Sequence, residues 1–207
     1  EAGTAVVVTL VSEDFDPVLM LTGPEGELLV LNDDTDGLET AQTPVVETGT
    51  FNWLNSGIYL PLPQTGTYTV QARSFSGLGG DYELAVRPAT TYEVLLYEGR
   101  RAYNGYYNNP DAGYDHQTAL ALFQAAIAVD PDQPYAYIDS VFARVSLALV
   151  NRPSGQEDPV WDTDPQLRVS LITDLREAQR TLAEQGLADS GWYSYVSNFL
   201  ARIQADE

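Results

Sequence analysis

The fold of this 207-residue chain is decided at the stretch Gly79-Gly80-Asp81-Tyr82-Glu83-Leu84-Ala85-Val86-Arg87-Pro88. Tyr82, Leu84 and Val86 alternate with polar or small residues, which is the period-two pattern of a strand with one apolar face. Proline has no N–H to donate to a sheet, so Pro88 ends the strand. From about Thr91 the apolar spacing becomes helical. We therefore predict two domains, a β domain over residues 1–87 and a helical domain over residues 88–207.

The β domain shows the same alternation in other segments. Apolar residues at positions 6, 8 and 10 share one face, as do those at positions 68, 70 and 72. Turn-forming sequences separate these runs, among them Gly23-Pro24-Glu25-Gly26, Asn55-Ser56-Gly57 and Gln64-Thr65-Gly66. Six or seven short strands at this spacing predict an antiparallel β-sandwich. The Thr-rich segment 38–51 is expected to be a surface loop or an extra hairpin.

The helical domain carries several apolar stripes. Residues 119–127 form the first stripe, and Asp130-Pro131-Asp132 ends the helix that carries it. Residues 135–150 and 167–182 predict further helices, joined by a long acidic loop at 151–165. A final stripe predicts a capping helix and consists of Trp192, Val196, Phe199, Leu200 and Ile203. The fold class is thus α+β with two domains, a sandwich followed by helical hairpins.

The β domain resembles the bacterial pre-peptidase C-terminal domain. The resemblance rests on Asp14-Phe15-Asp16-Pro17, Asn32-Asp33-Asp34, Gly66-Thr67-Tyr68-Thr69-Val70 and Gly80-Asp81-Tyr82-Glu83-Leu84-Ala85-Val86, which occur in that order. It implies a small sandwich that accompanies secreted hydrolases and other exported proteins as a non-catalytic accessory. It also implies an extracellular or cell-surface location, reached with a signal peptide that this chain does not contain.

The helical domain resembles the tetratricopeptide repeat. Ala119, Phe123, Ala126 and Pro131 match the order of the second helix of that repeat, and the segment 97–103 resembles a loose first helix. The insert 108–114 lengthens the turn between the two helices. The resemblance implies one and a half repeats with a cap, which is a module for protein contacts.

The charge of the chain narrows the choice of partners. It has 30 acidic residues against 10 basic ones, all Arg, so its formal net charge is −20. Acidity on this scale repels phosphate backbones and anionic lipid, so we expect no nucleic acid partner. We also expect no membrane insertion, because no apolar run is long enough to span a bilayer. Cations, basic proteins and neutral glycans remain as partners.

The residue inventory argues against an enzyme. The chain has no Cys, no Lys, one His and no Gly-x-Ser-x-Gly motif, so the usual nucleophilic triads are nearly excluded. His116 follows Asp115 at a predicted helix start, where a capping or surface role is simplest. Composition alone leaves a glycosidase-like carboxylate pair open, but no spacing singles one out. We predict no catalytic residue.

The sharpest local motif is Asn32-Asp33-Asp34-Thr35-Asp36-Gly37. Oxygen-bearing side chains at Asn32, Asp34 and Asp36 occupy alternate positions before a glycine, as in the first half of a calcium loop. The second half is missing, because Thr43 stands in place of the usual Glu. Glu39 or Glu47, or Asp14 and Asp16 from a neighbouring loop, are candidates to complete the ligand set. The alternative is a solvated acidic turn, because Asn and Asp favour turn geometry.

Four tyrosines near the helical insert are candidates for binding a partner. Tyr103, Tyr106, Tyr107 and Tyr114 offer large rings with a polar edge, which suits contacts with protein or polysaccharide. The alternative is that these rings fill the core between repeat helices.

The resemblance also predicts an open sheet edge. Domains of the family usually have a strand before the segment that matches Glu1-Ala2-Gly3-Thr4, and here that strand is missing. We therefore expect Thr4–Val11 to be an edge strand, which would accept a strand from another chain. The alternatives are a short variant of the domain, or loss of the strand together with an upstream region.

These observations support two hypotheses of function. The first is an exported, non-catalytic interaction or structural subunit, which self-assembles through the open edge or binds another exported protein. The second is a targeting module of a secreted hydrolase, which binds polymeric substrate with its aromatic residues and uses calcium. An enzyme with paired carboxylates is the least supported of the alternatives.

Overall fold

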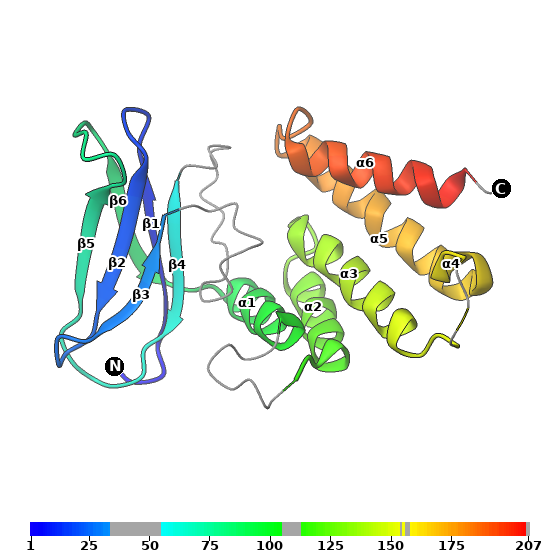
Figure 1. Ribbon diagram of the computed structural model, residues 1–207, viewed down its shortest axis with the longest axis horizontal. Helices are drawn as coiled ribbons and strands as arrows, with labels where there is room; N and C mark the ends of the chain where they lie inside the picture. Colours follow the sequence, from blue (N-terminus) through cyan, green and yellow to red (C-terminus); the bar gives the residue numbers. More distant parts are fainter. Residues whose placement is uncertain (34–54, 105–112, 154, 156–157, 206–207) are drawn as a thin grey trace. The chain divides into compact units, whose positions relative to one another are not determined.

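The computed structural model describes residues 1–33, 55–104, 113–153, 155 and 158–205. The chain forms two compact units, Glu1–Thr90 and Thr91–Glu207. In the described residues, the first unit contains strands and no helix, and the second contains helices and no strand (Figure 1). The protein therefore has the predicted α+β organisation.

The first unit is a sandwich of two antiparallel three-stranded sheets. One sheet has the order β4–β1–β6, formed by β4 (Ser56–Pro61), β1 (Ala5–Val11) and β6 (Glu83–Pro88). The other has the order β3–β2–β5, formed by β3 (Leu28–Asn32), β2 (Pro17–Thr22) and β5 (Thr69–Ser74). The predicted antiparallel β-sandwich is confirmed.

An apolar core lies between the two sheets. Its fully buried members come from four strands and are Val8, Leu10, Leu19, Leu21, Val30 and Ile58. Val8 and Leu10 lie on the face of β1 that the sequence pattern predicted to be apolar. Val7 is buried as well, although it points to the opposite face of β1, where it lies opposite Tyr59 of β4. The core-facing side chains therefore hold the two sheets together by burying apolar surface.

One hydrogen bond fixes which backbone groups of β6 face β1. The Ala89 N–H donates to the Ala5 carbonyl at 2.9 Å, and these residues continue the β1–β6 register. Bonded and non-bonded pairs alternate in an antiparallel ladder, so Ala85 and Arg87 also direct their backbone groups toward β1. Leu84 and Val86 therefore direct their N–H and C=O groups to the other side of β6.

The predicted location of the sheet edge was wrong. β1 pairs with β4 on one side and with β6 on the other, so Thr4–Val11 is a central strand. Within the described residues, the outer strands of this sheet are β4 and β6. The error arose because the chain changes sheets between strands, which brings its last strand beside its first.

The second unit is built from six helices in the part of the chain that the structure describes. They are α1 (Thr91–Asn104), α2 (His116–Val129), α3 (Tyr135–Val150), α4 (Val160–Thr163), α5 (Pro165–Glu184) and α6 (Gly191–Gln204). Side-chain oxygens of Asp115, Asp164 and Ser190 accept backbone N–H groups at the starts of α2, α5 and α6. The single-turn helix α4 lies in the segment that was predicted to be a loop.

The predicted helical stripes form the core of this unit. α1 packs against α2, α2 against α3, α3 against α5, and α5 against α6. The core of the last three long helices includes Ile138, Val141, Leu171, Leu175, Leu182, Val196, Leu200 and Ile203. Among the described residues, no helix combines the length and apolar character that a membrane crossing needs.

Gly99 allows α1 to approach α2 closely. A Cβ atom at this position would lie 2.5 Å from Cε1 of Phe123, which is itself buried in α2. We expect Gly99→Ala to lower the free energy of unfolding by about 1–3 kcal/mol through overpacking, although alanine favours helix by about 1 kcal/mol. Chemical denaturation measures this change. If the overpacking account is right, adding Phe123→Leu will recover part of the loss; a more stable Gly99→Ala variant would contradict it.

Candidate functional site

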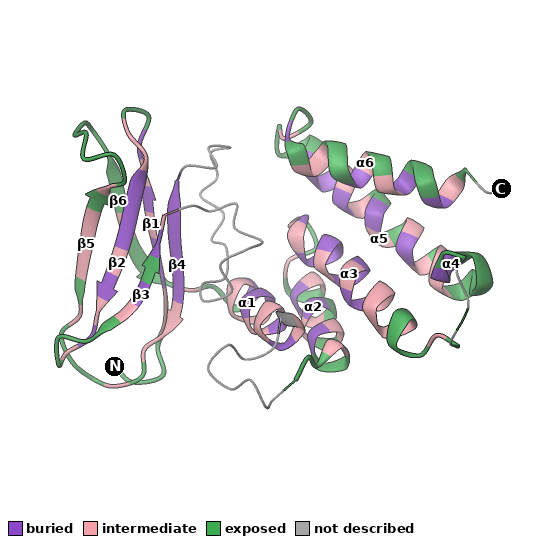
Figure 2. Ribbon diagram, in the orientation of Figure 1, coloured by how far each residue is buried: buried purple, intermediate pink, exposed green. Residues whose placement is uncertain are grey.

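The strand β6 exposes apolar side chains that point toward the sandwich core. Val86 lies opposite Val8 and Leu84 opposite Leu10, so all four side chains share the inner face of the sheet. Val8 and Leu10 are buried, yet Val86 is 58% exposed and Leu84 is 40% exposed. Figure 2 shows the contrast between the exposed β6 and the largely buried β4.

Further apolar residues surround this strand. Tyr82 immediately precedes β6, and Phe75 and Leu78 lie in the segment between β5 and β6; all three are exposed. We call the set Phe75, Leu78, Tyr82, Leu84 and Val86 the open side of the sandwich. Single exposed apolar residues are common on proteins, but several on adjoining segments are typical of an interaction surface.

The opposite edge of the same sheet differs in its hydrogen bonding. Gly57 of β4 directs its N–H away from β1, by the same alternation that holds for β6. That N–H donates to Oδ1 of Asn32, at 2.9 Å, from the neighbouring sheet. Asn32 is buried, and its Oδ1 acts here as a backbone acceptor. The outward N–H of Gly57 in β4 thus has a side-chain acceptor. For the outward N–H groups of Leu84 and Val86 in β6, the described residues provide no such acceptor.

The start of β6 is held by the turn that follows β1. Ser12 Oγ donates to the Asp81 carbonyl at 2.8 Å, and the Asp81 N–H donates to Oδ2 of Asp14 at 2.7 Å. Gly80 is required here, because a Cβ at this position would lie 2.3 Å from Cβ of Asp14. The ring of Tyr82 meets that of Phe15 edge to face at 6.3 Å. These contacts fix the position of β6 although its outer side is exposed.

Three of the five candidate calcium ligands, Asn32, Asp14 and Asp16, lie in the described part of the chain. Asp34 and Asp36 lie outside the described residues, and Asn32 and Asp14 accept the backbone N–H groups noted above. Oδ1 of Asp16 is buried and has no hydrogen-bond partner in the described part of the chain. Across residues 1–33, 55–104, 113–153, 155 and 158–205, no group of three or more His, Asp or Glu side chains is placed to hold a metal. Calcium binding stays a prediction.

Asp16 gives a testable consequence for stability. Burial, and then repulsion from Asp33, raise the pKa of Asp16 above its usual value. A raised folded-state pKa means that the carboxylate form weakens the fold above that pKa, and that this penalty disappears as the pH falls through it. We expect Asp16→Asn to raise the free energy of unfolding at pH 7 by up to about 1 kcal/mol, with no gain at pH 3.

The measurement is chemical denaturation of both proteins at the two pH values, with Glu25→Gln as a control at an exposed acid. Millimolar calcium is a second arm, because an ion bound beside Asp16 and Asp33 would stabilise the natural chain more than Asp16→Asn. A loss of stability at pH 7 in Asp16→Asn without calcium would contradict the account of the pKa.

The tyrosines predicted to bind a partner are divided by the structure. Tyr103 is half-buried in α1, and its hydroxyl shares a hydrogen bond with Oγ of Ser146 in α3 at 2.9 Å. Tyr114 is 73% exposed, and its ring stacks on His116 at 5.9 Å, while the ring of Tyr103 lies 5.0 Å from His116. Tyr106 and Tyr107 lie outside the described residues.

Sequence analysis did not anticipate this aromatic group. His116 lies between Tyr103 and Tyr114, and its Nδ1 is buried without a hydrogen-bond partner in the described residues. Asp115 is the helix cap, since it accepts the Thr118 N–H at 2.9 Å. Contact with two rings and the burial of Nδ1 give His116 a packing role, so the predicted capping or surface role is corrected.

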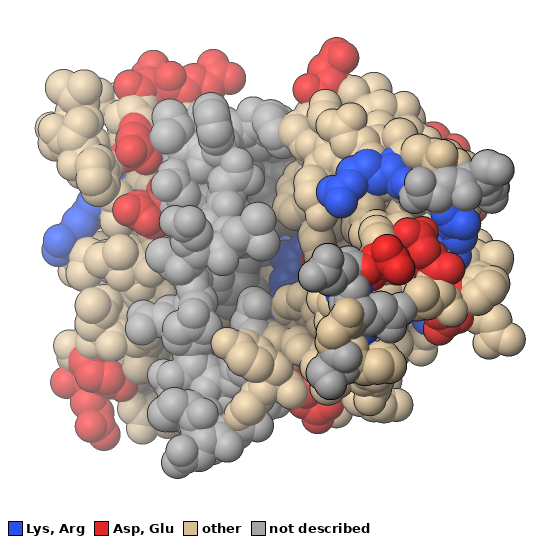
Figure 3. Space-filling model, turned by 45° about the vertical axis from the view of Figure 1, so that its right-hand side comes forward, with Lys and Arg blue, Asp and Glu red and all other residues tan. Residues whose placement is uncertain are grey.

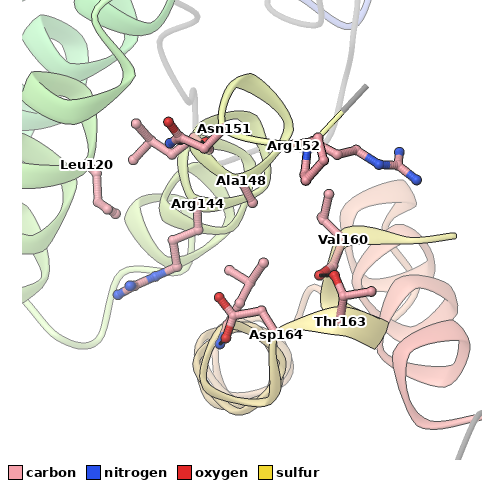
Figure 4. Close-up of a pocket in the computed structure, with 11 residues that line it drawn as sticks. Leu120, Arg144, Ala148, Asn151, Arg152, Val160, Thr163 and Asp164 are labelled. Atoms are coloured by element: carbon pink, nitrogen blue, oxygen red, sulfur yellow. Dashed lines mark hydrogen bonds between the residues drawn. The ribbon is translucent and has the colours of Figure 1, made fainter. Parts of the chain in front are cut away.

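A pocket of about 410 Å³ lies in the helical unit among α2, α3, α4 and α5 (Figure 4). Figure 4 shows the guanidinium groups of Arg144 and Arg152 pointing away from each other, so they do not converge on one anion. Arg144 donates to Asp174 at 3.2 Å, and the Asp164 carboxylate caps α5. Arg144 and Asp164 are therefore engaged in holding the helices. Arg152 donates to the Asp158 carbonyl, and its Nε is buried with no hydrogen-bond partner among the described residues.

Acidic side chains lie on the surface of both units (Figure 3). Comparison of the chain with protein-family models, curated proteins and solved structures found no match. Function is therefore inferred from the surfaces themselves. The open side of the sandwich is the starting point, because it gathers five exposed apolar residues on adjoining segments.

Proposed function

We propose that this protein is a non-catalytic, exported interaction subunit whose sandwich accepts a β-strand from a partner along β6. The observation that carries the proposal is that β6, an outer strand, exposes Leu84 and Val86 on the face that belongs to the core. An added strand would cover these side chains and pair with the outward backbone groups of the same two residues. The export and the cell-surface location rest on the resemblance to the pre-peptidase C-terminal domain.

The preferred partner segment follows from the geometry of the edge. Side chains alternate between the two faces of a strand, so every second residue of the partner would face the core beside Leu84 and Val86. We expect those residues to be apolar and the intervening ones to be polar.

A selection from a library of displayed extended peptides tests this proposal. The immobilised full chain is the target. The Val86→Pro variant is the counter-target, because this variant lacks one outward N–H of β6. We expect enriched peptides to alternate apolar and polar residues and to bind the natural chain but not the variant. Equal enrichment on both proteins, or none on either, would contradict the proposal.

Polysaccharide binding is the second candidate function, and the exposed ring of Tyr114 favours it. Flat exposed rings stack on sugars, and the contact with His116 holds this ring in place. Electrophoresis through gels that contain soluble polysaccharides would show retardation of the natural chain, lost in Tyr114→Ala. Val169→Ala, at an exposed position of α5, is the control. Unchanged mobility in every gel would remove this candidate.

A further inference from the structure

We propose that the strand added at β6 is β6 of a second copy of this chain, paired antiparallel about a twofold axis at Ala85. The proposal rests on the proposed function, because it names the occupant of the same edge. It is argued from three properties of the strand: the direction of its backbone groups, the order of its side chains and the position of its proline.

The backbone of β6 suits pairing with itself. In the register centred on Ala85, Leu84 lies opposite Val86 of the second copy, and Val86 opposite Leu84. Both residues direct their N–H and C=O groups away from β1, so each of these pairs exchanges both hydrogen bonds. Ala85 faces its own counterpart in a pair that needs no hydrogen bond, because its backbone groups already face β1. One continuous sheet would then run through both copies.

The side chains are complementary in the same register. Glu83 lies opposite Arg87 of the second copy, and the twofold axis creates this pair twice. Both residues are exposed and lie on the outer face of the sheet, in a non-bonded pair, where opposing side chains come closest. On the inner face, Leu84 and Val86 of the two copies form one apolar strip. The strand therefore matches charge with charge on one face and apolar with apolar on the other.

Pro88 restricts the register. Its missing N–H would point to the outer side of β6, which is where proline is tolerated in a sheet. In the proposed register Pro88 lies opposite Tyr82, whose N–H can donate to the Pro88 carbonyl. If the second strand is shifted by two residues in one direction, Leu84 lies opposite Pro88. Proline has no N–H, so the Leu84 carbonyl then has no donor. The opposite shift sets Glu83 opposite Ala85 and breaks the reciprocal pair with Arg87.

The overall charge predicts how this contact responds to salt. The two copies carry −20 each, and residues 1–87 alone hold 13 acidic residues and two Arg, so long-range repulsion opposes the contact. Salt screens repulsion between distant exposed charges. We expect the second copy to bind more tightly at high than at low ionic strength, the reverse of a contact driven by opposite net charges.

Cross-linking through Ala85→Cys tests the register directly. The chain contains no Cys, so a single introduced thiol reports on a single contact. Opposing residues in a non-bonded antiparallel pair have Cα atoms about 4.5 Å apart, which a disulfide can span. We expect oxidation of Ala85→Cys to give a covalent dimer at least about tenfold faster than oxidation of Val169→Cys, an exposed control on α5.

A charge exchange supplies a second test that does not need a thiol. Glu83→Arg and Arg87→Glu each place like charges opposite one another, and we expect each to weaken the dimer measured by light scattering. The double variant restores opposite charges and is expected to recover the dimer. Circular dichroism checks that each variant remains folded.

The outcomes separate this inference from the proposed function. A monomer at all protein and salt concentrations, with Ala85→Cys reacting no faster than Val169→Cys, would overturn the second copy as the occupant. If peptides selected on the natural chain then still depend on the N–H of residue 86, strand addition stands with a different partner. If they do not, the proposed function fails as well.

Discussion

Replacing Val86 by proline is expected to abolish strand addition at β6 while leaving the sandwich folded. The N–H of Val86 points away from β1, so proline at this position removes a bond only from an added strand. In a twofold dimer the substitution occurs twice, so two hydrogen bonds of about 1 kcal/mol each are lost. Each proline ring also clashes with the opposing strand. We expect the two effects together to weaken association by at least about 100-fold. Sedimentation or light scattering over a concentration series measures this effect.

Ala85→Pro is the matched control for that experiment. The Ala85 N–H faces β1, so proline there removes a bond from the sandwich itself and leaves a carbonyl of β1 without its donor. We expect this variant to lose about 2 kcal/mol or more of stability. If instead Val86→Pro unfolds the sandwich and Ala85→Pro does not, the assigned direction of the β6 backbone groups is wrong.

Replacing Arg100 by methionine is expected to cause the largest loss of stability in the helical unit. Nε of Arg100 lies 2.6 Å from Oδ2 of Asp139, and the two side chains are only 15% and 12% exposed. Without the guanidinium, the carboxylate would remain buried and uncompensated, which costs about 3–5 kcal/mol. Chemical denaturation followed by helical circular dichroism measures the loss.

The pH dependence of Arg100→Met identifies the cause of this loss. Burial raises the pKa of Asp139, and Arg100 opposes that effect. Removing Arg100 therefore raises the folded-state pKa further, and the deficit relative to the natural chain shrinks as the pH falls through that pKa. The double variant Arg100→Met with Asp139→Leu is expected to be more stable than Arg100→Met alone. A deficit that is independent of pH would point to lost packing instead.

The sequence predicted most of the strands and helices, but not which strand lies at an edge. It also placed a turn at Asn55-Ser56-Gly57, where β4 begins, and a loop where α4 lies. Alternation at Tyr82, Leu84 and Val86 shows that these residues share a face, and the structure agrees that the face points to the core. The alternation does not show whether another strand covers that face. The error over Thr4–Val11 has the same origin, because strand order depends on contacts between residues far apart in the chain.

The candidate ligands show a second limit of sequence reasoning. Asn32 was predicted as a metal ligand because Asn and Asp recur at alternate positions, yet the same residue accepts a backbone bond from Gly57 across the sandwich. The oxygen atoms that suit calcium also suit backbone N–H groups, so the pattern alone does not distinguish these roles. The packing of His116 between two tyrosine rings depends on the contact of α1 with α2, which brings Tyr103 beside His116.

Amide hydrogen exchange at β6 is the most direct test of the claim that this strand is an acceptor edge. At low concentration, the account predicts fast exchange of the Leu84 and Val86 amides and slow exchange of the Ala85 and Arg87 amides, which bond to β1. At high concentration, or with a selected peptide bound, the Leu84 and Val86 amides should become protected. Unprotected exchange of both amides under every condition would contradict the account.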